Sequence, residues 1–578
     1  MELSLSTIIS SLFQMLLDRA QLDRVNGDPP AHNPESPSID LAAEARAALD
    51  YKLNIIELMV NLFNDHAARL LSTIRHRRNQ HAPIHRLPPE MISLIFELAG
   101  PGAQRCYLKN DVPFNVMQVS RDWRQIAMES PRVWAHISMI PEPLLSTFLE
   151  RSKNVPLELT FYRTTRKAML HYMSHISPLH LERTRALKID LTGMEMQIRK
   201  VESWLSTPLP ALERLEISQL AEELVPPGGL NVGGVTARLR HLSLEGFFIP
   251  FDHPIYSNLV TLTLQSFAHI ETHTAVLLLR VLEASPFLEE LSLQDVGRTT
   301  AEPAPPAERV SSTQMVNLPH LRLLCLIRVA VPITQFLFAH ITIPASSRTV
   351  LTVADVLPPG DEDIATIIPS QPESLRNITA TTELTIFGKE RAFQAEGRAL
   401  ESGGSFFLAI ANGESGLSYR VLERFAKVVP MPHLQALTLF GFNRSKKDPG
   451  GLARALGHLT SLTTLQFHIC HPTLVEIVTV SRARDRHVCP LLQNLTLLAC
   501  SIKEEALLKL VRSRAFVPGD EPSLPGQPLE RLDLIDCWKL TREVIPKLLE
   551  YVKVVYWGAR RFEQVKAESV SAENSESG

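Results

Sequence analysis

Two groups of histidine and cysteine residues have the residue types and the close spacing that a metal site requires. His269 and His273 are four residues apart, which would place both imidazoles on one face of a helix. No third ligand follows them at a recognisable spacing, so ordinary surface histidines are the favoured interpretation. The second group would offer nitrogen and sulfur ligands to zinc, and it consists of His468, Cys470, His471, His487, Cys489 and Cys500.

Motifs for other kinds of chemistry do not occur in the sequence. It contains no phosphate-binding loop, no Gly-x-Ser-x-Gly nucleophile motif and no His-Glu-x-x-His motif of zinc proteases. We therefore predict no catalytic site and no bound cofactor. We expect that the chain is not an enzyme.

A pattern of leucines recurs along the chain and indicates which elements position these residues. Each copy reads Leu-x-x-Leu-x-Leu, Ile or Phe, with a further apolar or Cys residue three positions later. The fourth and sixth positions alternate as in a short strand, and helical periodicity lies between copies, which is typical of leucine-rich repeats. Because such a unit cannot bury its own apolar face, we expect the copies to stack into a solenoid. The nine copies begin at Leu212, Leu239, Leu259, Leu288, Leu321, Leu434, Leu462, Leu492 and Leu529.

The repeat pattern also assigns three cysteines to the core. Cys470, Cys500 and Cys537 occupy the last apolar position of their copies, where other copies have Phe or Val. The second histidine and cysteine group is therefore predicted to be packed core, and no metal site is expected. Six cysteines without paired spacing suit a reducing compartment, which favours a cytoplasmic or nuclear location.

Composition describes a large folded chain with no bias toward nucleic acid or membrane. The 578 residues are 45% apolar and 21% charged, with a formal net charge of −3. This length exceeds one compact domain, and the small net charge provides no general attraction for nucleic acid or anionic lipid. No uncharged apolar run reaches the roughly 18 residues needed to cross a bilayer. The expected partners are therefore proteins, bound by a surface.

Residues 1–80 are predicted to form two helices separated by a linker rich in Pro and Gly. The second helix, over residues 40–78, has apolar residues at alternating steps of four and three, which makes a heptad seam. This seam would pack against the first helix or the next domain, or alternatively it would form a dimeric coiled coil. The seam residues are Leu49, Leu53, Ile56, Val60, Phe63, Ala67, Leu70 and Ile74.

The repeat solenoid is predicted to span residues 145–557 with inserted loops. Its irregular stretch between residues 321 and 434 is expected to hold two or three degenerate units, with strands at Leu351 and Leu384. The following segment, residues 558–578, is rich in Ser and Glu at its end and is predicted to be a disordered tail.

Two short amphipathic helices are predicted between the N-terminal region and the repeats, within residues 83–138. The chain reads IHRLPPEMISLIFELAG from Ile84 and VSRDWRQIAMESPRVWAHI from Val119. Both halves resemble the F-box family, whose pattern is Leu-Pro-x-Glu, two aliphatic residues and Ile-Phe, followed by Val-Cys/Ser-Arg-x-Trp-Arg and a terminal Leu/Val-Trp. The expected fold class is therefore α/β, a leucine-rich-repeat solenoid preceded by a small all-α F-box domain and N-terminal helices.

The F-box resemblance implies a protein partner for this segment. It implies binding to a Skp-type adaptor and, through it, to a cullin in a ubiquitin ligase whose chemistry lies in other subunits. Packing on the N-terminal helices or on the first repeats is the alternative for the same residues. Ile126 and Trp134 are expected in the F-box core, and the implied adaptor-binding residues are Leu87, Pro88, Met91, Ile92, Ile95, Phe96, Val119 and Trp123.

Together these patterns predict the substrate-recognition subunit of such a ligase, and the alternative is an F-box-like repeat scaffold without ligase assembly. The sequence does not identify the target protein. The outward positions of the repeat strands are the candidates for target binding. They are Arg214 and Glu216, Arg240 and Ser243, Thr261 and Thr263, Glu290 and Ser292, Leu323 and Cys325, Ala436 and Thr438, Thr464 and Gln466, Asn494 and Thr496, and Arg531 and Asp533.

Overall fold

The structure is a computed structural model, in which the chain divides into two units, residues 1–89 and 90–578. His269, His273 and His487 lie outside the described residues, as does most of the first predicted helix. The described residues are 11, 14, 15, 18, 41–99, 112–138, 140, 142–161, 171–172, 174–191, 203–219, 232, 238–267, 274–297, 315–353, 374–388, 392–410, 417–442, 449–479, 488–515 and 528–563.

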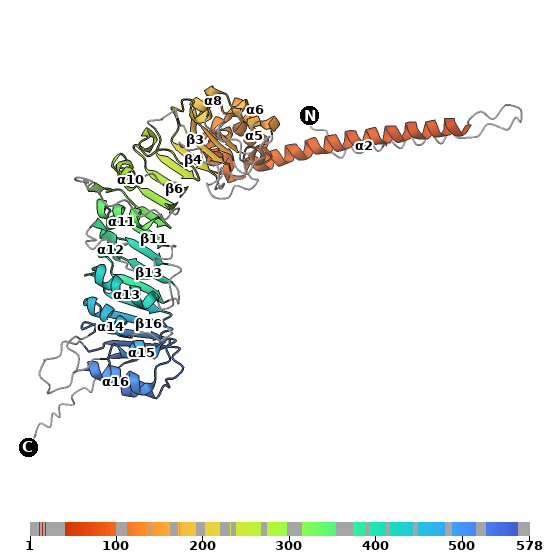
Figure 1. Cartoon of the computed structure of the whole chain (residues 1–578). Helices are drawn as coiled ribbons and strands as arrows, with labels where there is room; N and C mark the ends of the chain where they lie inside the picture. The colour runs from red at the N-terminus through yellow and green to blue at the C-terminus, as the bar shows by residue number, and fades with distance from the viewer. Residues whose placement is uncertain are drawn as a thin grey trace, which may run out of the picture. The chain divides into compact units, whose positions relative to one another are not determined.

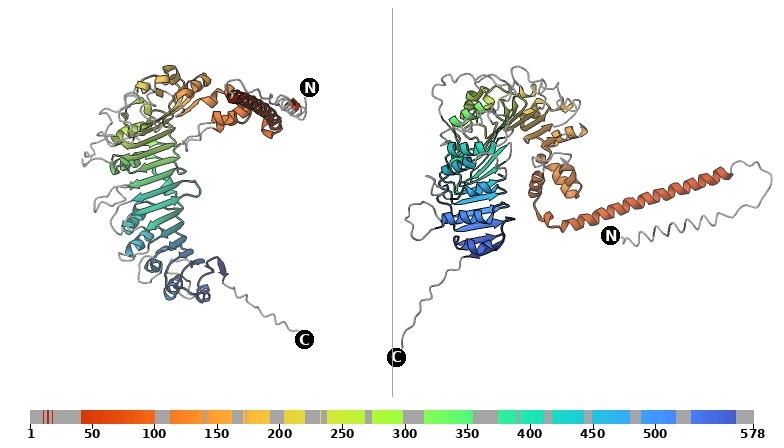
Figure 2. Two further views of the ribbon diagram at one scale, coloured as in Figure 1. Left: turned by 90° about the vertical axis from the view of Figure 1, so that its right-hand side faces the viewer. Right: turned by 60° about the horizontal axis from the view of Figure 1, so that its bottom comes forward.

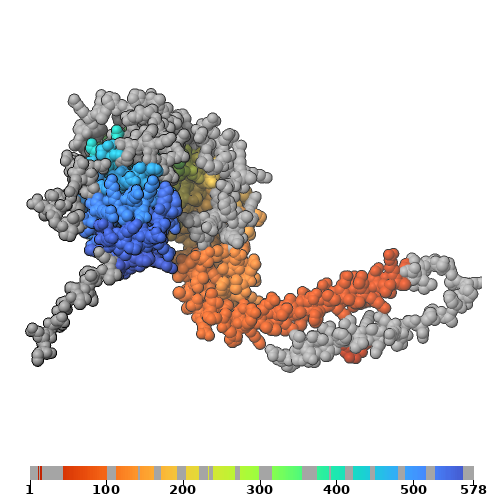
Figure 3. Space-filling view, turned by 90° about the horizontal axis from the view of Figure 1, so that it is seen from below, coloured from red at the N-terminus to blue at the C-terminus, as the bar shows by residue number. Residues whose placement is uncertain are grey.

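The described residues 41–89 of the first unit contain the long helix α2 (Leu41–Gln80), followed by the short 3-10 helix η1 (Pro83–Arg86). Figure 3 shows α2 as an orange-red rod. No Gly or Pro interrupts α2, and Ala, Leu, Glu and Arg favour helix throughout it. Arg77 and Arg78 lie in its last turn, where positive charge complements the helix dipole. The helix predicted over residues 40–78 is thus confirmed.

Four short helices precede the sheet: α3 (Pro89–Leu98), α4 (Val112–Met117), α5 (Arg121–Glu129) and the 3-10 helix η2 (Pro131–Trp134). Helices α3 and α5 are the two amphipathic helices that the sequence predicts, whereas the six residues of α4 are too few to show a helical period. The hydroxyl of Ser120 caps α5 by accepting a hydrogen bond from the backbone N–H of Trp123 at 3.1 Å.

One 18-stranded sheet runs through the second unit. Within each of the two blocks of repeats, the strand of one copy pairs in parallel with the strand of the next copy, and Figure 2 shows the strands following one another from yellow through green to blue. In spatial order the strands are β1 (His136–Ser138), β2 (Leu157–Phe161), β3 (Thr184–Asp190), β4 (Arg214–Ser218), β5 (His241–Glu245), β6 (Thr261–Phe267), β7 (Glu290–Val296), β9 (Leu323–Ile327), β11 (Arg348–Val353), β14 (Ser405–Ile410), β13 (Phe393–Arg398), β12 (Glu383–Gly388), β15 (Ala436–Phe440), β16 (Thr464–His468), β17 (Asn494–Leu498), β18 (Arg531–Ile535), β19 (Val554–Trp557) and β20 (Arg560–Glu563).

Helices connect the strands and cover one side of the sheet, as Figure 1 shows for α10 to α14. A separate small sheet pairs β8 (Val316–Asn317) with β10 (Ile341–Thr342). This mixed arrangement of helices and a mainly parallel sheet agrees with the α/β class that the sequence predicts. The connecting helices are α6 (Glu142–Arg151), α8 (Pro178–Glu182), η3 (Pro254–Tyr256), α10 (Thr274–Glu283), α11 (Val331–His340), α12 (Arg376–Thr379), α13 (Leu417–Val428), α14 (Pro449–His458), α15 (Pro472–Glu476), α16 (Glu504–Arg514) and α17 (Val544–Leu549).

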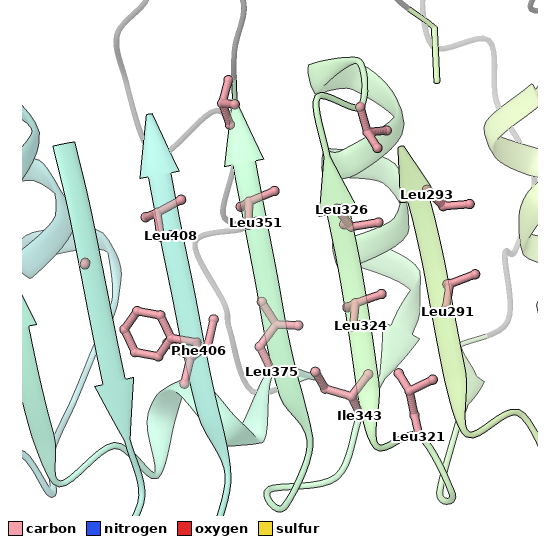
Figure 4. Packing of buried hydrophobic residues seen from close by; sticks show 14 of the residues in the cluster. Leu291, Leu293, Leu321, Leu324, Leu326, Ile343, Leu351, Leu375, Phe406 and Leu408 are labelled. Carbon is pink, nitrogen blue, oxygen red and sulfur yellow. The ribbon is translucent and has the colours of Figure 1, made fainter. Parts of the chain in front are cut away.

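The repeated leucines form the core between the sheet and the helices. Buried residues alternate along the repeat strands with residues that are half-buried or exposed, so the leucines of the pattern point to the helix side. Pairing in register then places equivalent leucines in continuous rows across the sheet. Figure 4 shows part of one row, in which Leu293, Leu326, Leu351 and Leu408 lie on neighbouring strands.

The parallel order is interrupted between β11 and β15 by a three-stranded meander. Strand β12 pairs in parallel with β15, β13 runs antiparallel between β12 and β14, and β14 returns to pair in parallel with β11. The predicted strands at Leu351 and Leu384 are present in β11 and β12. The antiparallel pair of β13 and β14 is not predicted by the sequence pattern. The irregular stretch between residues 321 and 434 therefore contains an insertion of different topology.

The sheet also extends beyond the predicted end of the repeats. Strand β20 (Arg560–Glu563) pairs antiparallel with β19, so residues 560–563 of the predicted tail belong to a hairpin at the edge of the sheet. Gly558 in its turn has a φ of +59°, a conformation that glycine adopts without steric cost. A two-residue turn of this kind is a common hairpin connection.

A residue with left-handed backbone follows or ends the regular part of eight of the nine repeat strands, all except β4. Its φ lies between 51° and 77°, and wherever the burial of the next residue is described, that residue, the last apolar position of the pattern, lies in the core. For a residue other than Gly, this conformation lowers the stability of the fold by roughly 1 kcal/mol. The residues concerned are Gly246, Ser266, Asp295, Arg328, Gly441, Ile469, Ala499 and Asp536.

We expect Gly246→Ala to destabilise the protein much more than Gly441→Ala. Both glycines have a left-handed φ, +70° and +77°, so alanine costs roughly 1 kcal/mol at either position from backbone strain. A Cβ at Gly246 would also lie 2.0 Å from the carbonyl oxygen of Gln219, whereas at Gly441 the nearest atom is 3.5 Å away. We expect about 3 kcal/mol or more in total at Gly246, because backbone must move.

Hydrogen exchange of the peptides that contain β4 to β6 and β15 to β16 measures these two costs separately. Gly441→Ala serves as the control for left-handed strain alone. Equal losses of hydrogen-exchange protection in the two variants would show that the close approach of Gly246 to Gln219 does not contribute to the destabilisation.

Candidate functional site

Helix α3 buries one apolar face against α5. Ile92 and Phe96, four residues apart, are both inside the core, and Phe96 is only 2% exposed. The ring of Phe96 contacts that of Trp123 on α5, with 5.0 Å between the ring centroids. The structure therefore places Ile92 and Phe96, two of the predicted adaptor-binding residues, in the interior, and Trp123 is half-buried beside them. These side chains hold α3 and α5 together.

The opposite side of α3 presents a second apolar face to solvent. Met91, Leu94, Ile95 and Leu98 have the spacing i, i+3, i+4, i+7 that makes one helical stripe. Their exposed fractions are 47%, 43%, 38% and 78%. We call these four residues the α3 stripe. Leu94 and Leu98 were missing from the predicted site, although the helical spacing from Met91 indicates them.

The remaining predicted adaptor-binding residues are also exposed. Leu87 and Pro88 belong to the first unit, and Leu87 is partly exposed after η1. Val119 lies in the turn between α4 and α5 and is exposed. Five of the eight predicted residues are thus accessible to a partner: Leu87, Pro88, Met91, Ile95 and Val119.

A cluster around Trp134 closes the small helical region. The Trp134 indole N–H donates a hydrogen bond to the carbonyl of Ala127 at 2.7 Å, and its ring lies 5.0 Å from that of Phe148 on α6. Phe114 on α4 meets the same ring edge-on at 6.3 Å. Ile126 is half-buried and packs against this core. The predicted core role of Ile126 and Trp134 therefore agrees with their positions.

The outward side of the sheet begins with a charged section on β1 to β5. Arg214 forms an ion pair with Glu158 at 2.7 Å, and Lys188 forms one with Glu216 at 2.5 Å. His136 lies 3.6 Å from the Glu158 carboxylate, and this interaction together with the charge of Arg214 lowers the pKa of Glu158. Charges of both signs alternate here, so the section has no strong field of either sign.

The register corrects one of the predicted outward positions. The residue opposite Arg214 is His241, which in turn lies beside Thr261, whereas Arg240 precedes β5. The guanidinium of Arg240 donates a hydrogen bond to the carbonyl of Asn258 at 3.2 Å. The candidate outward residue of this copy is therefore His241. Burial lowers its pKa, so His241 favours the neutral form.

An apolar section occupies the middle of the outward side. Cys325 on β9 lies beside Val350 on β11, which lies beside Phe407 on β14, and all three are half-buried. Leu323 and Ile327 extend the section along β9. Polar residues would normally occupy the outward positions of a sheet that faces water. We call these five residues the apolar section.

Aromatic and charged residues follow on the last strands. Phe387 and Phe440 lie on the adjacent strands β12 and β15 with ring centroids 5.6 Å apart. Further on, Arg531 forms a bidentate ion pair with Asp533 and lies 4.4 Å from the Tyr556 ring centroid, a cation–π distance. Outward positions of the sheet therefore differ in chemistry from one end to the other.

The cysteines at the last apolar position of the repeats are core residues, as predicted. The thiols of Cys470, Cys500 and Cys537 donate hydrogen bonds to carbonyls of the preceding strand, at 3.2, 3.3 and 3.4 Å. All three side chains are buried. Among the residues that the structure describes, no group of histidine, cysteine and acidic side chains is arranged to hold a metal ion.

We expect the buried thiols to resist alkylation in the native protein. Burial raises the pKa of Cys470 and Cys489 to about 12 and that of Cys537 to about 11. At pH 8 their thiolate fraction is then on the order of 1,000-fold below that of an ordinary thiol near pKa 8.5. Timed labelling located by mass spectrometry, in buffer and in urea, measures the difference. The half-buried Cys325 is the internal control and should react before Cys470, Cys489 and Cys537.

Elemental analysis of the same sample complements the labelling. Stoichiometric zinc, or fast native labelling of Cys470, would contradict the assignment of these cysteines to the repeat core.

The sequence matches no protein-family model and no curated protein. Within the described parts of the chain, no helix has both the length and the apolar character needed to cross a membrane.

Proposed function

We propose that this protein is an F-box protein with a leucine-rich-repeat solenoid, acting as the substrate-recognition subunit of a Skp/cullin/F-box ubiquitin ligase. The α3 stripe would bind the Skp-type adaptor, and the outward side of the repeat strands would bind the target protein. The observation that carries the proposal is the pair of faces on α3. One face packs against Trp123 in the core, and the other exposes four large apolar side chains to solvent.

The exposed stripe supports binding of a protein partner at α3. Monomeric proteins rarely leave contiguous large apolar side chains exposed, and such patches mark interaction sites. The stripe lies in the segment that resembles the F-box, and it includes Met91 and Ile95 of the implied adaptor site. Desolvation of Leu94 and Leu98 in the same interface would add apolar area to it.

The parallel register of the repeat strands supports the solenoid and the position of the target site. Equivalent residues of successive copies lie side by side from β4 to β9, so the outward positions form an extended surface. Solenoid proteins bind partners on such surfaces. The apolar section between the charged and aromatic ends is the best candidate for the centre of the interface, because binding energy concentrates in desolvated apolar centres.

Copurification of the full chain with a coexpressed Skp-type adaptor tests the adaptor role. We expect the unmodified protein to retain the adaptor and Leu94→Asp/Ile95→Asp to lose it by at least about 100-fold, because two charges would be buried in the interface. Both residues are exposed, so the fold should persist. Leu179→Asp/Leu400→Asp is the matched control, since these leucines are exposed outside α3 and should not affect retention.

Failure of the unmodified chain to retain the adaptor would contradict the ligase proposal. The alternative, an F-box-like scaffold for protein interactions without ligase assembly, would then be favoured.

A separate variant tests the target surface. Phe407→Glu places a charge in the apolar section and is expected to reduce recovery of target proteins while adaptor retention stays unchanged. Leu179→Glu is the control, because Leu179 is an exposed residue of the connecting helix α8 and not an outward strand position. If Phe407→Glu also loses the adaptor, the substitution has disrupted folding in general and does not report on the apolar section.

A further inference from the structure

Helix α2 exposes a long apolar seam. Of the eight seam residues, six are between 49% and 65% exposed, namely Leu49, Leu53, Ile56, Val60, Phe63 and Ile74. Ala67 and Leu70 are half-buried. A helix of this kind is normally stabilised by packing of its apolar face, since propensity alone gives marginal helices in water. The seam therefore requires a cover.

The preceding predicted helix is too short to cover the whole seam. Even if all of residues 3–22 were helical, they would span about 30 Å, whereas the 26 residues from Leu49 to Ile74 span about 39 Å. Part of the seam would therefore stay exposed. Tyr51, Leu58 and Leu62, which lie off the seam, are also about 60% exposed and can receive the preceding helix. The seam remains available for another molecule.

The seam is complementary to itself in antiparallel orientation. A twofold axis between Asn61 and Leu62 pairs every a position of one helix with a d position of the other, as an antiparallel coiled coil requires. Small or branched residues then meet large ones at the centre. The four layers, each formed twice, are Leu49 with Ile74, Leu53 with Leu70, Ile56 with Ala67, and Val60 with Phe63.

Charge favours the antiparallel arrangement over the parallel one. Residues 41–60 contain three acidic and two basic side chains, whereas residues 61–80 contain one acidic side chain, Asp65, and the four arginines Arg69, Arg75, Arg77 and Arg78. A parallel pair would place the two sets of arginines together. An antiparallel pair places each basic half against the slightly acidic half and also opposes the helix dipoles.

From these observations we infer that a second copy of this chain covers the seam, with two α2 helices forming an antiparallel coiled coil. This association is independent of the proposed adaptor and target sites, which lie outside α2. Each assembly then carries two copies of the outward strand surface. A target with two binding sites would be held more tightly by such a pair, because the second contact becomes intramolecular.

Light scattering of the full chain after size exclusion tests the association. We expect twice the chain mass of 64.7 kDa for the unmodified protein and a single chain mass for Ile56→Asp/Phe63→Asp. Tyr51→Asp/Leu58→Asp is the matched control, because it introduces the same charges on exposed residues of the same helix outside the seam. We expect this control to remain dimeric.

Three results would overturn the inference. The unmodified protein could have the mass of one chain, the seam variant could remain dimeric, or the control could dissociate as readily as the seam variant. Loss of adaptor retention plays no part in this readout, so failure of the proposed ligase function would be distinguishable.

Disulfide crosslinking tests the orientation. Leu49→Cys/Ile74→Cys is expected to form a covalent dimer on mild oxidation, joined by bonds between position 49 of one chain and position 74 of the other. Leu49→Cys alone and Ile74→Cys alone should not crosslink, since like positions lie at opposite ends of an antiparallel pair. Efficient crosslinking of either single variant would show a parallel pair and overturn the antiparallel assignment.

Discussion

Replacing Arg514 with alanine is expected to lower the free energy of unfolding of the C-terminal repeats by about 4 kcal/mol. Arg514, at the end of α16, is buried, and its guanidinium donates hydrogen bonds to three backbone carbonyls. These belong to Val478 at 3.0 Å, Cys489 at 3.1 Å and Val488 at 2.7 Å. Alanine would leave all three carbonyls without this donor and would open a cavity among them.

The arrangement is unusual because the buried cation has no acidic partner among the described residues. Burial lowers the pKa of Arg514, and the three carbonyl dipoles offset the cost of removing the charge from water. The carbonyls lie on both sides of residues 480–487, so one side chain ties together the two ends of that segment. Arg514→Ala also removes the buried charge and with it part of the cost of desolvating that charge. The expected loss in the free energy of unfolding is therefore limited to about 4 kcal/mol.

Hydrogen exchange of peptides from α15 to β17 measures the effect at the site, which matters because a chain of several units does not unfold in one step. Arg514→Lys should recover only part of the loss, since one ammonium group cannot reproduce the planar fork of three donors. Arg512→Ala is the control: Arg512 is exposed, 5.4 Å from the Tyr551 ring centroid, and should cost about 1 kcal/mol or less. A loss at Arg514 no larger than at Arg512 would contradict this role.

The sequence predicts the repeat strands well because one physical constraint determines them. A leucine at every second position must face the core, and a shift of one residue would expose the whole set. Leu215, Leu242, Leu262 and Leu291 accordingly lie in one row in the sheet. The core position of Cys500 follows from the same constraint, since its neighbours in other copies are apolar.

The meander of β12, β13 and β14 could not be predicted in this way. Its strands also alternate, but alternation does not specify whether a neighbouring strand is parallel, and the pairing of β14 with β11 joins residues far apart in the chain. Gly397 is one local sign of the insertion, because the Phe406 ring occupies the space where a side chain would lie. A single glycine does not reveal such a contact in the sequence.

Helix α3 shows a similar limit for the candidate site. The sequence shows that α3 is apolar almost all round, but only the packing of Phe96 on Trp123 decides which face is buried. Ile92 and Phe96 are therefore core residues, and Leu94 and Leu98 belong to the exposed stripe. Arg514 was not identified at all, because an arginine in the last turn of a helix is usually explained by the helix dipole.

Trp134→Ala is expected to destabilise the helical region before the sheet by about 4 kcal/mol. Trp134 is 1% exposed and is the largest side chain of its cluster, so alanine would leave a large cavity between α4, α5 and α6. Its ring contacts Phe148 and Phe114, and the guanidinium of Arg151 lies over it at 4.7 Å. All of these contacts would be lost together.

Trp134→Phe separates packing from hydrogen bonding at this site. Phenylalanine keeps most of the ring volume but removes the indole N–H that bonds to the Ala127 carbonyl. That carbonyl retains a weaker bond from the Ser130 backbone N–H at 3.4 Å, so we expect a loss of about 1–2 kcal/mol. Hydrogen exchange of peptides from α4 to α6 measures both variants.

Trp538→Ala is the control for the removal of a tryptophan, since Trp538 is 67% exposed and should cost within about 0.5 kcal/mol. The expected order of losses is Trp134→Ala, then Trp134→Phe, then Trp538→Ala. Because α5 positions α3 through Trp123, opening of this cluster should also disorder the α3 stripe. Trp134→Ala is therefore expected to reduce retention of the proposed adaptor, although Trp134 is not part of the α3 stripe. If hydrogen-exchange protection of α4 to α6 is lost but adaptor retention is unchanged, the α3 stripe folds independently of the cluster around Trp134.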